Sequence, residues 1–360
     1  MMPKRRPQAT TTFKHRARNR TGHRTLLLLI GLALWSGCPQ PEPTPEGAPA
    51  PQLAGKPAIQ VSTTVSGPIQ PIPLEIELDE ARVQLGDQLF HEKGLSSDGS
   101  ISCASCHNLK LAGTDRKRVS SGVGGAVGDV NSPTVFNSGF NFKQFWDGRA
   151  ETLEEQVDGP LRAEKEMNSN WETAIAFLSA NPEYVASFDE IYPDGITQDN
   201  VRNAIAEFER SLYTPNSRFD QYLRGDETAI TEQELAGFEL FQGLGCVSCH
   251  QGANVGGNMF ETFGVMDDYF ADRGNVVEAD MGRFNVTGRE VDRHVFKVPS
   301  LRNVALTPPY FHDGTVRRLP DAVRIMAKYN LGRTLSDEQV DLIVAFLGSL
   351  TGEYQGQMLP

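Results

Sequence analysis

Acidic residues are absent from the first 24 positions of the chain, where eight Lys and Arg residues gather instead. The apolar run that follows, Leu26 to Trp35, is too short to cross a membrane, because a spanning helix needs roughly 20 apolar residues. A basic segment, a short apolar core and then small residues are typical of a signal peptide for export. We therefore predict that residues 1–38 are a leader rather than a membrane span.

Unpaired cysteines are scarce, since only Cys38 of the five stands outside a C-x-x-C pair. It follows Ser36 and Gly37 directly behind the apolar core, as the lipidated cysteine of a lipoprotein does. The alternative is a plain secretory signal, because lipoprotein signals usually have Leu where this chain has Trp35. The Pro-rich residues 39–73 favour a lipid anchor, since such a linker holds a domain off a surface. We therefore predict that the protein contacts the membrane only through the lipid on Cys38.

The chain as a whole lacks excess positive charge, with 34 Lys and Arg against 46 Asp and Glu and a net charge of −12. Without the eight cations of the leader, 26 cations remain against 46 anions, a net charge of −20. A body this acidic excludes nucleic acid as a natural partner. It favours a cationic partner whose approach is steered by charge.

Alternating strand patterns are scarce as well, and Gly- and Pro-rich loops separate helical stretches. We predict a mainly α fold of two domains with long loops and little strand. The helices are expected after the capping residues Asp79 and Thr231 and in five further stretches: 151–157, 171–178, 197–212, 319–329 and 336–350.

An internal duplication underlies the two-domain prediction. Leu85-Gly86-x-x-Leu89-Phe90 in the first helix matches Ala236-Gly237-x-x-Leu240-Phe241 in a later one, and each helix leads into a C-x-x-C-H pentad. The predicted domains are residues 74–222 and residues 223–360, each with one pentad.

The pentads are Cys103-Ala-Ser-Cys106-His107 and Cys246-Val-Ser-Cys249-His250. In this motif both thiols bond covalently to one haem, and the adjoining His becomes the proximal iron ligand. Zinc and thioredoxin-like sites share C-x-x-C, but two identical pentads behind similar helices in an exported chain favour haem. The sequence thus predicts two covalently bound haem c groups, with His107 and His250 as ligands.

Strong ligands for the other side of the first iron are lacking, because no His or Met lies between His107 and Ala150. An iron without a second protein ligand is a place where peroxide could bind.

Many ordered motifs resemble those of the bacterial di-haem cytochrome c peroxidases, a superfamily that includes MauG. The resemblance covers about residues 74–352. It implies two c-type cytochrome-like haem domains, the first with the peroxidatic haem and the second with the electron-transfer haem. Its motifs are Cys103–Leu109, Asn131–Asn137, Phe145–Ala150, Leu153–Gln156, Gly159-Pro160, Glu166-Met167, Phe296–Asn303, Thr307–Gly314 and Leu319–Met326.

The resemblance implies roles for four side chains. Glu166 corresponds to the acid that moves a proton between the peroxide oxygens, and Gln156 to its polar neighbour. Trp146 corresponds to an aromatic electron bridge between the haems. Met326 corresponds to the axial ligand of the second haem, where a thioether raises the potential. Without the family, Glu166 would be interpreted as a surface residue, and Trp146 and Met326 as core residues.

The resemblance also implies a calcium site between the haems. Its oxygen ligands would come from Asn131 and from the carbonyls of Thr307 and Pro309. His312 is expected to have a structural or propionate-contacting role rather than to bind iron.

One departure from the family pattern concerns the loop Ser120-Ser-Gly-Val123-Gly-Gly. Many members have a His there that caps the first haem until the other haem is reduced. Valine cannot bind iron, so we expect a first haem that stays open and an enzyme that is active without reductive activation.

Three functions remain in competition. The first is a peroxidase that reduces hydrogen peroxide with electrons from a cationic small cytochrome c or cupredoxin in the periplasm. The second is a MauG-like enzyme that oxidises residues of a partner protein through a high-valent haem pair. Known enzymes of that kind have Tyr in place of Met326, which favours the peroxidase, although Tyr329 is close in sequence. The third is an electron carrier, for which Glu166 would be unneeded. A homodimer is usual among similar proteins.

Overall fold

The computed structural model describes residue 59 and residues 67–360. The chain divides into two units, residues 1–52 and 53–360, and all the described residues belong to the second unit. The predicted leader, Cys38 and most of the predicted linker lie outside the described residues. The predicted boundary at residues 222 and 223 stays a prediction, and a short helix, α8 (Arg218–Leu223), spans it.

The described residues are mainly helical, which confirms the predicted fold class. Their helices are α1 (Glu80–His91), α2 (Cys103–Cys106), α3 (Leu153–Gln156), α4 (Asp158–Arg162), α5 (Trp171–Ser179), α6 (Pro182–Ile191), α7 (Gln198–Ser211), α8 (Arg218–Leu223), α9 (Glu232–Leu244), α10 (Tyr269–Arg273), α11 (Phe284–Thr287), α12 (Leu319–Leu331) and α13 (Asp337–Ser349). Two antiparallel pairs of strands are the described sheets: β1 (Phe260–Thr262) with β2 (Val295–Lys297), and β3 (Glu353–Tyr354) with β4 (Gln357–Met358).

The N-terminal half is built on the contact between α1 and α7. Asp79 caps α1 by accepting a hydrogen bond from the Arg82 amide, which begins the helix where the sequence predicts it. The apolar face of α7 buries Val201, Ile205 and Phe208, because these residues recur at helical spacing. Val201 and Ile205 share a core with residues of α5 and α6, and α6 was not predicted.

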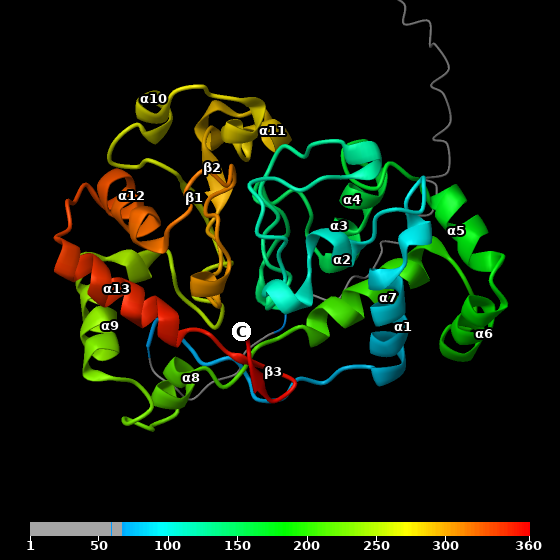
Figure 1. Ribbon diagram of the computed structural model, residues 1–360, viewed down its shortest axis with the longest axis horizontal. Coiled ribbons are helices and arrows are strands. Elements are labelled where there is room, and N and C mark those ends of the chain that lie inside the picture. The colour runs from blue at the N-terminus through cyan, green and yellow to red at the C-terminus, as the bar shows by residue number, and fades with distance from the viewer. Residues whose placement is uncertain (1–58, 60–66) are drawn as a thin grey trace, which may run out of the picture. The chain divides into compact units, whose positions relative to one another are not determined.

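The C-terminal half repeats the arrangement with α9 and α13, which lie side by side in Figure 1. Thr231 and Glu234 form the predicted capping box at the start of α9. Phe241, Phe346 and Leu350 are buried in its core.

The predicted duplication has a packing reason at two glycines. A Cβ added at Gly86 would overlap the carbonyl oxygen of Ala204 in α7, and one added at Gly237 would overlap that of Leu342 in α13. Both helix pairs therefore cross at a glycine, which lets the two backbones approach closely. One turn further along, Phe90 packs on Phe208 at 5.2 Å between ring centroids, and Phe241 packs on Phe346 at 5.1 Å.

Packing begins within the segment predicted as linker. Ile69 and Ile72 are buried, and Ile69 belongs to the core of the C-terminal half. Arg302 fixes this segment by donating to the Gln70 carbonyl oxygen and pairing with Asp220 at 2.7 Å, both charged side chains being fully buried.

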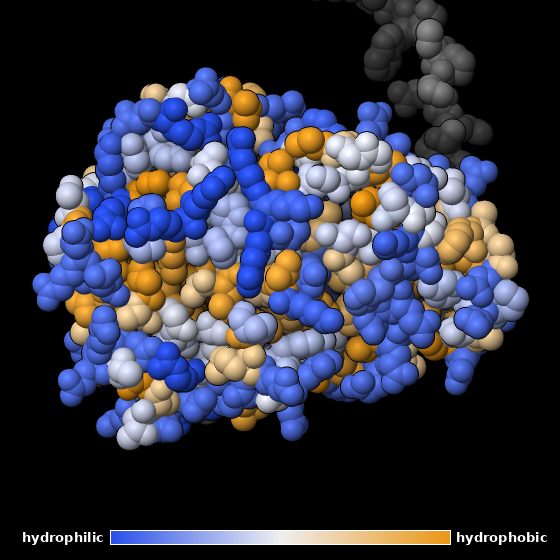
Figure 2. All heavy atoms as spheres, viewed as in Figure 1, coloured by the Kyte–Doolittle hydropathy of each residue, from blue (hydrophilic) through white to orange (hydrophobic). Residues whose placement is uncertain are grey.

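Within residues 59 and 67–360, no helix is long and apolar enough to cross a membrane. The face drawn in Figure 2 is mostly hydrophilic, with apolar side chains in small scattered groups.

Candidate active site

The second pentad follows α9 directly, where Gly245 takes a left-handed conformation (φ 94°) and ends the helix. This turn places Cys246, Cys249 and His250 around one cavity. Nδ1 of His250 lies 3.3 Å from the Val255 carbonyl oxygen, so this nitrogen carries the proton and Nε2 is left as the metal-binding atom. Burial lowers the pKa of His250 to about 4, which keeps the ring in the neutral form that binds metals.

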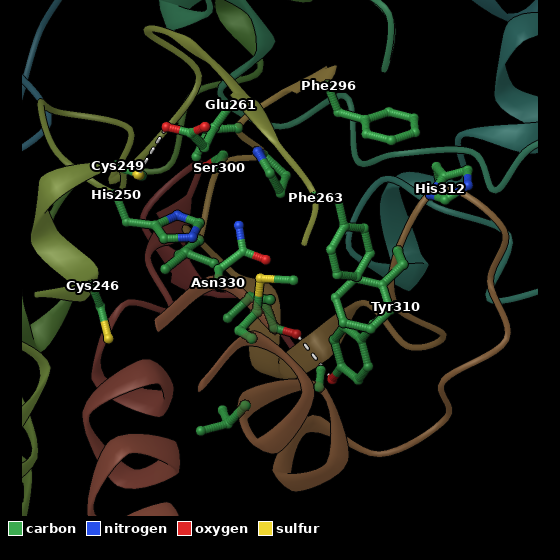
Figure 3. A pocket seen from close by; sticks show the side chains of 18 of the residues that line it. Cys246, Cys249, His250, Glu261, Phe263, Phe296, Ser300, Tyr310, His312 and Asn330 are labelled. Atoms are coloured by element: carbon green, nitrogen blue, oxygen red, sulfur yellow. Dashed lines mark hydrogen bonds between the residues drawn. The ribbon is translucent and has the colours of Figure 1, made fainter. Parts of the chain in front are cut away.

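The cavity has a volume of about 510 Å³ and is lined mainly by apolar side chains. Figure 3 shows His250 pointing into it, with Cys249 beside Glu261 and with Phe263 and Tyr310 across the space. Met326, from α12, lines the same cavity. Two thiols, a neutral imidazole, a thioether and an apolar volume of this size fit a haem c group.

Tyr329 behaves differently from Met326 on the same helix. It is absent from the cavity lining, and its hydroxyl donates to Asp272 at 2.9 Å. Of these two side chains on α12, Met326 is therefore the one that could bind a haem iron in this cavity.

Two charged residues of this cavity were missed from the sequence. Glu261, on β1, has its carboxylate 3.9 Å from the Cys249 sulfur. Lys297, on β2, is buried, and burial lowers its pKa to about 8, an effect that Asp147 partly offsets. Lys297 lies in the Phe296–Asn303 motif, which was the available clue, whereas nothing in the sequence singled out Glu261.

The first pentad forms α2, with His107 directly behind it. Nδ1 of His107 lies 3.4 Å from the Gly113 carbonyl oxygen, the counterpart of the His250 contact. Burial lowers the pKa of His107 as well, so both imidazoles are neutral. The first pentad therefore presents the same donor set as the second and fits a second haem c.

Gln156 and Glu166 lie near this pentad. Gln156, at the end of α3, lines a small cavity of about 20 Å³ together with Cys103. The Glu166 residue is exposed, and partial desolvation of its carboxyl group raises the pKa of that group. The charge of Arg149 partly offsets this shift, and the charge of Asp129 adds to it. A raised pKa suits a group that must hold and release a proton near neutral pH.

The loop with Val123 packs against the segment that carries Glu166. The Val123 amide donates to the Glu166 carbonyl oxygen at 2.8 Å, and a Cβ at Gly122 would overlap the Lys165 carbonyl oxygen. Glycine at position 122 therefore permits a close approach of the two backbones. The short helical turn Val123–Gly125 brings no imidazole, thioether or other strong iron ligand to this place.

Trp146 connects the two halves. Its indole N–H donates to the Asn131 carbonyl oxygen at 2.9 Å, and its own carbonyl accepts from the Lys297 amide at 2.8 Å. Its ring lies 6.4 Å from that of His312 between centroids, in an edge-to-face arrangement. Trp146 also lines the large cavity, so it stands beside the second haem site on the side of the first domain.

His312 also lines the large cavity, and its Nε2 atom lies 2.7 Å from the Asp280 carboxylate. Among the described residues, Asp280, His312 and Asp313 bring an imidazole and two carboxylates close enough together to hold a metal ion. Arg273 bonds both carboxylates, so a guanidinium already supplies the positive charge there.

Asn131, Thr307 and Pro309 all line the large cavity, which places the three predicted calcium ligands around one space. The Asn131 amide nitrogen donates to the Lys117 carbonyl oxygen at 2.9 Å, which fixes the orientation of that side chain. The calcium site itself stays a prediction.

Comparison with known proteins agrees with this geometry. A family model described as di-haem cytochrome c peroxidase matches residues 80–228. A cytochrome c551 peroxidase of Nitrosomonas europaea is 45% identical over 294 residues, covering 81% of this chain and 86% of the relative. The chain belongs to the di-haem cytochrome c peroxidase family.

One further protein sequence and one solved structure are also similar to this chain. The cytochrome c peroxidase Ccp of Escherichia coli K12 is 50% identical over 292 residues, which are 81% of this chain but 62% of that relative's length. The crystal structure of a MauG-like protein associated with microbial copper homeostasis matches with a TM-score of 0.70 and 29% identity, covering 81% of this chain and 95% of that one. The predicted family is thus confirmed, and the predicted enzyme class agrees with the names of the peroxidase relatives.

Proposed function

We propose that this member of the di-haem peroxidase family reduces hydrogen peroxide to water with electrons from a small redox protein. The observation that carries the proposal is the unequal surroundings of two similar pentads. His250 shares its cavity with Met326, whereas His107 has Gln156 and Glu166 nearby and a loop without a strong ligand. Covalently bound haem would supply the redox chemistry at both sites.

The side chains of the N-terminal site divide the remaining work. Glu166, with its raised pKa, takes a proton from one peroxide oxygen and delivers it to the other. Gln156, fixed at the end of α3, orients the substrate by hydrogen bonding. Trp146 lies on the electron route between the two sites.

The missing ligand at Val123 leads to the second part of the proposal: the N-terminal haem is open in the oxidised enzyme, which acts without reductive activation. The test is an absorption and EPR study of the fully ferric protein, followed by peroxide without reductant. A high-spin signal that disappears with peroxide supports the proposal. Two low-spin haems that do not respond to peroxide contradict it.

Val123→His sharpens this test, because it restores the residue that many relatives have. We expect the variant to show a low-spin N-terminal haem and to need prior reduction before it reacts. Val127→His is the matched control, since Val127 is 63% exposed in the same loop. Identical spectra for both variants would show that position 123 does not face the iron.

The alternative is a MauG-like oxidation of residues in a partner protein, favoured by the open first haem and by the likeness to a MauG-like structure. The place of Met326, in contrast to Tyr329, favours the peroxidase. Assays with electron donors and with candidate protein substrates distinguish the two functions, since a peroxidase turns over peroxide with a reduced cytochrome alone.

The remaining parts of the proposal concern location and partners. We propose a periplasmic protein, tethered through lipid on Cys38, with calcium between the haems and the ability to form a homodimer. The net charge of −20 for the mature chain favours a cationic small cytochrome c or cupredoxin as donor. The rate of electron delivery should then fall as ionic strength rises.

A further inference from the structure

A buried acid lies beside the N-terminal haem site and has no part in the function proposed so far. Glu209, on α7, lines the 20 Å³ cavity together with Cys103 and Gln156. It is 6% exposed, and its Oε2 atom is buried with no hydrogen-bond partner among the described residues. An unpartnered buried carboxylate is costly, which favours the neutral acid.

The charges around Glu209 do not compensate for its burial. Burial raises its pKa to about 8, Arg210 lowers it, and Glu154 on α3 raises it further. Arg210 bonds both oxygens of Glu154, at 2.9 and 3.0 Å, and pairs with Glu207, so its charge is shared with other carboxylates.

The other titratable groups near this part of α7 come from the helices packed against it. The negative charge of Glu209 contributes to raising the pKa of the Cys103 thiol on α2. From α1, the ring of His91 lies 6.4 Å from that of Phe208.

In the C-terminal half, the position that corresponds to Glu209 is not an acid. The helix crossings at Gly86 and Gly237 align Ala204 with Leu342 and Phe208 with Phe346, which pairs Glu209 with Leu347. Two serines support this alignment, since Ser211 and Ser349 donate to the carbonyl oxygens of these two phenylalanines, each at 2.6 Å. Leu347 lines the cavity of the C-terminal site. The same position therefore holds a leucine beside the electron-transfer site and an acid beside the peroxidatic site.

The cavity between Glu209 and Gln156 has room for one water molecule, since about 10–15 Å³ of such volume suffices. Most of its lining is apolar, so a water there would bond chiefly to these two side chains. Such a water would connect Glu209 to Gln156, the residue that the proposed function places next to peroxide.

We propose that Glu209 is a redox-linked proton carrier of the N-terminal haem site. Reduction of a bound haem iron would raise the proton affinity of the Glu209 carboxyl group. At a pH near that at which the group titrates, it would bind a proton as the electron arrives and release the proton as the electron leaves, which limits the change in charge of the buried site. The inference rests on the proposed function for the use of that proton, because reducing peroxide to two waters consumes two electrons and two protons.

The test is the midpoint potential of each haem, measured by spectroelectrochemistry between pH 5 and pH 10 in the intact holoprotein. We expect the potential of the N-terminal haem to fall as pH rises through the range around the Glu209 pKa, because the reduced site holds the extra proton. Glu209→Gln should flatten that fall and leave the C-terminal haem unchanged. Glu172→Gln, which removes a carboxyl from the exposed side of α5, should leave both curves unchanged.

The proposal would be overturned if the midpoint potential of the N-terminal haem depended on pH in the same way in Glu209→Gln and in the parent protein. A second readout is the infrared difference spectrum between the reduced and oxidised protein. The carbonyl band of a protonated carboxyl should change on reduction and be lost in Glu209→Gln, and its absence from the parent protein would equally overturn the proposal. Neither readout needs turnover, so a failed peroxidase assay would contradict the proposed function and leave this result standing.

Discussion

The two halves of this protein use one scaffold for two environments. In each half, a helix crosses its partner at a glycine, packs phenylalanine on phenylalanine and leads into a C-x-x-C-H pentad whose His donates to a backbone carbonyl. The surroundings then diverge. Met326 lies in the cavity of the C-terminal half, whereas Gln156, Glu166 and Glu209 gather near the N-terminal pentad. Repeated helices thus position the two pentads that we propose to bind haem, and a few side chains distinguish the two sites.

The buried charges sharpen this contrast. The N-terminal half buries the acid Glu209, and the C-terminal half buries the base Lys297, each with a pKa of about 8 and therefore far from its ordinary value. Both shifts have the same cause, since burial penalises whichever form is charged. The two sites thus differ in the sign of the charge that can be placed beside the haem.

The largest expected effect comes from removing the acid that distinguishes the N-terminal site. Glu166→Gln keeps the shape of the side chain but cannot deliver a proton, so peroxide turnover should fall by about 10²- to 10⁴-fold. Steady-state kinetics with a reduced small cytochrome measure this loss. The potential of the C-terminal haem should not change.

Glu164→Gln is the matched control, because it makes the same change at an exposed position two residues away. Turnover by Glu166→Gln at the parental rate would remove Glu166 from the mechanism and leave the two halves less different than proposed.

A second change acts on the C-terminal half alone. Met326→Ala removes the thioether from the large cavity, and we expect the potential of that haem to fall by a substantial part of the roughly 0.8 V that axial ligands span. Electron delivery should slow, while the ferric N-terminal haem still reacts with peroxide. Potentiometric titration followed by absorption measures the shift.

Met266→Ala is the control for this variant, since Met266 is 61% exposed. An unchanged potential in Met326→Ala would mean that another group occupies the axial position.

Much of this comparison could be predicted from the sequence. Capping residues such as Asp79 and Thr231 mark helix starts by local hydrogen bonding, and the pentads carry their ligands at fixed spacing. The repeated Gly86 and Gly237 pattern predicted two equivalent helices. These features are local, so the sequence contains them directly.

Other features depend on which distant segments meet. Glu209 is one of many glutamates along the chain, and its burial follows from the packing of α7 against α1 and α3. Glu261 reaches Cys249 only because β1 pairs with β2. Such contacts arise from tertiary structure, and no short pattern encodes them.

The buried acid Glu209 should also make the stability of the folded protein depend on pH. Because the folded-state pKa of Glu209, about 8, is above its ordinary value of 4.5, the folded protein binds more protons than the unfolded chain between these values. Glu209 therefore lowers the free energy of unfolding progressively as pH rises from about 4.5 to 8. Glu209→Gln should remove this loss, so that the variant gains a few kcal/mol relative to the parent protein over that range.

Urea unfolding of the two proteins at several pH values measures this difference. A constant difference across the range would contradict the raised pKa, and Glu172→Gln should follow the parent protein throughout.

The smallest expected effects test whether the two scaffolds are equivalent. Gly86→Ala and Gly237→Ala each push a Cβ into a carbonyl oxygen of the crossing helix, which should cost about 1–3 kcal/mol of unfolding free energy. Gly243→Ala, also in α9 but with open space around its Cβ, should be neutral or stabilise by up to about 1 kcal/mol. Urea midpoints at constant m-value measure all three. A large loss of unfolding free energy in Gly86→Ala with none in Gly237→Ala would show that the two helix crossings share a sequence pattern but pack differently. The alignment of Glu209 with Leu347 would then lose its basis.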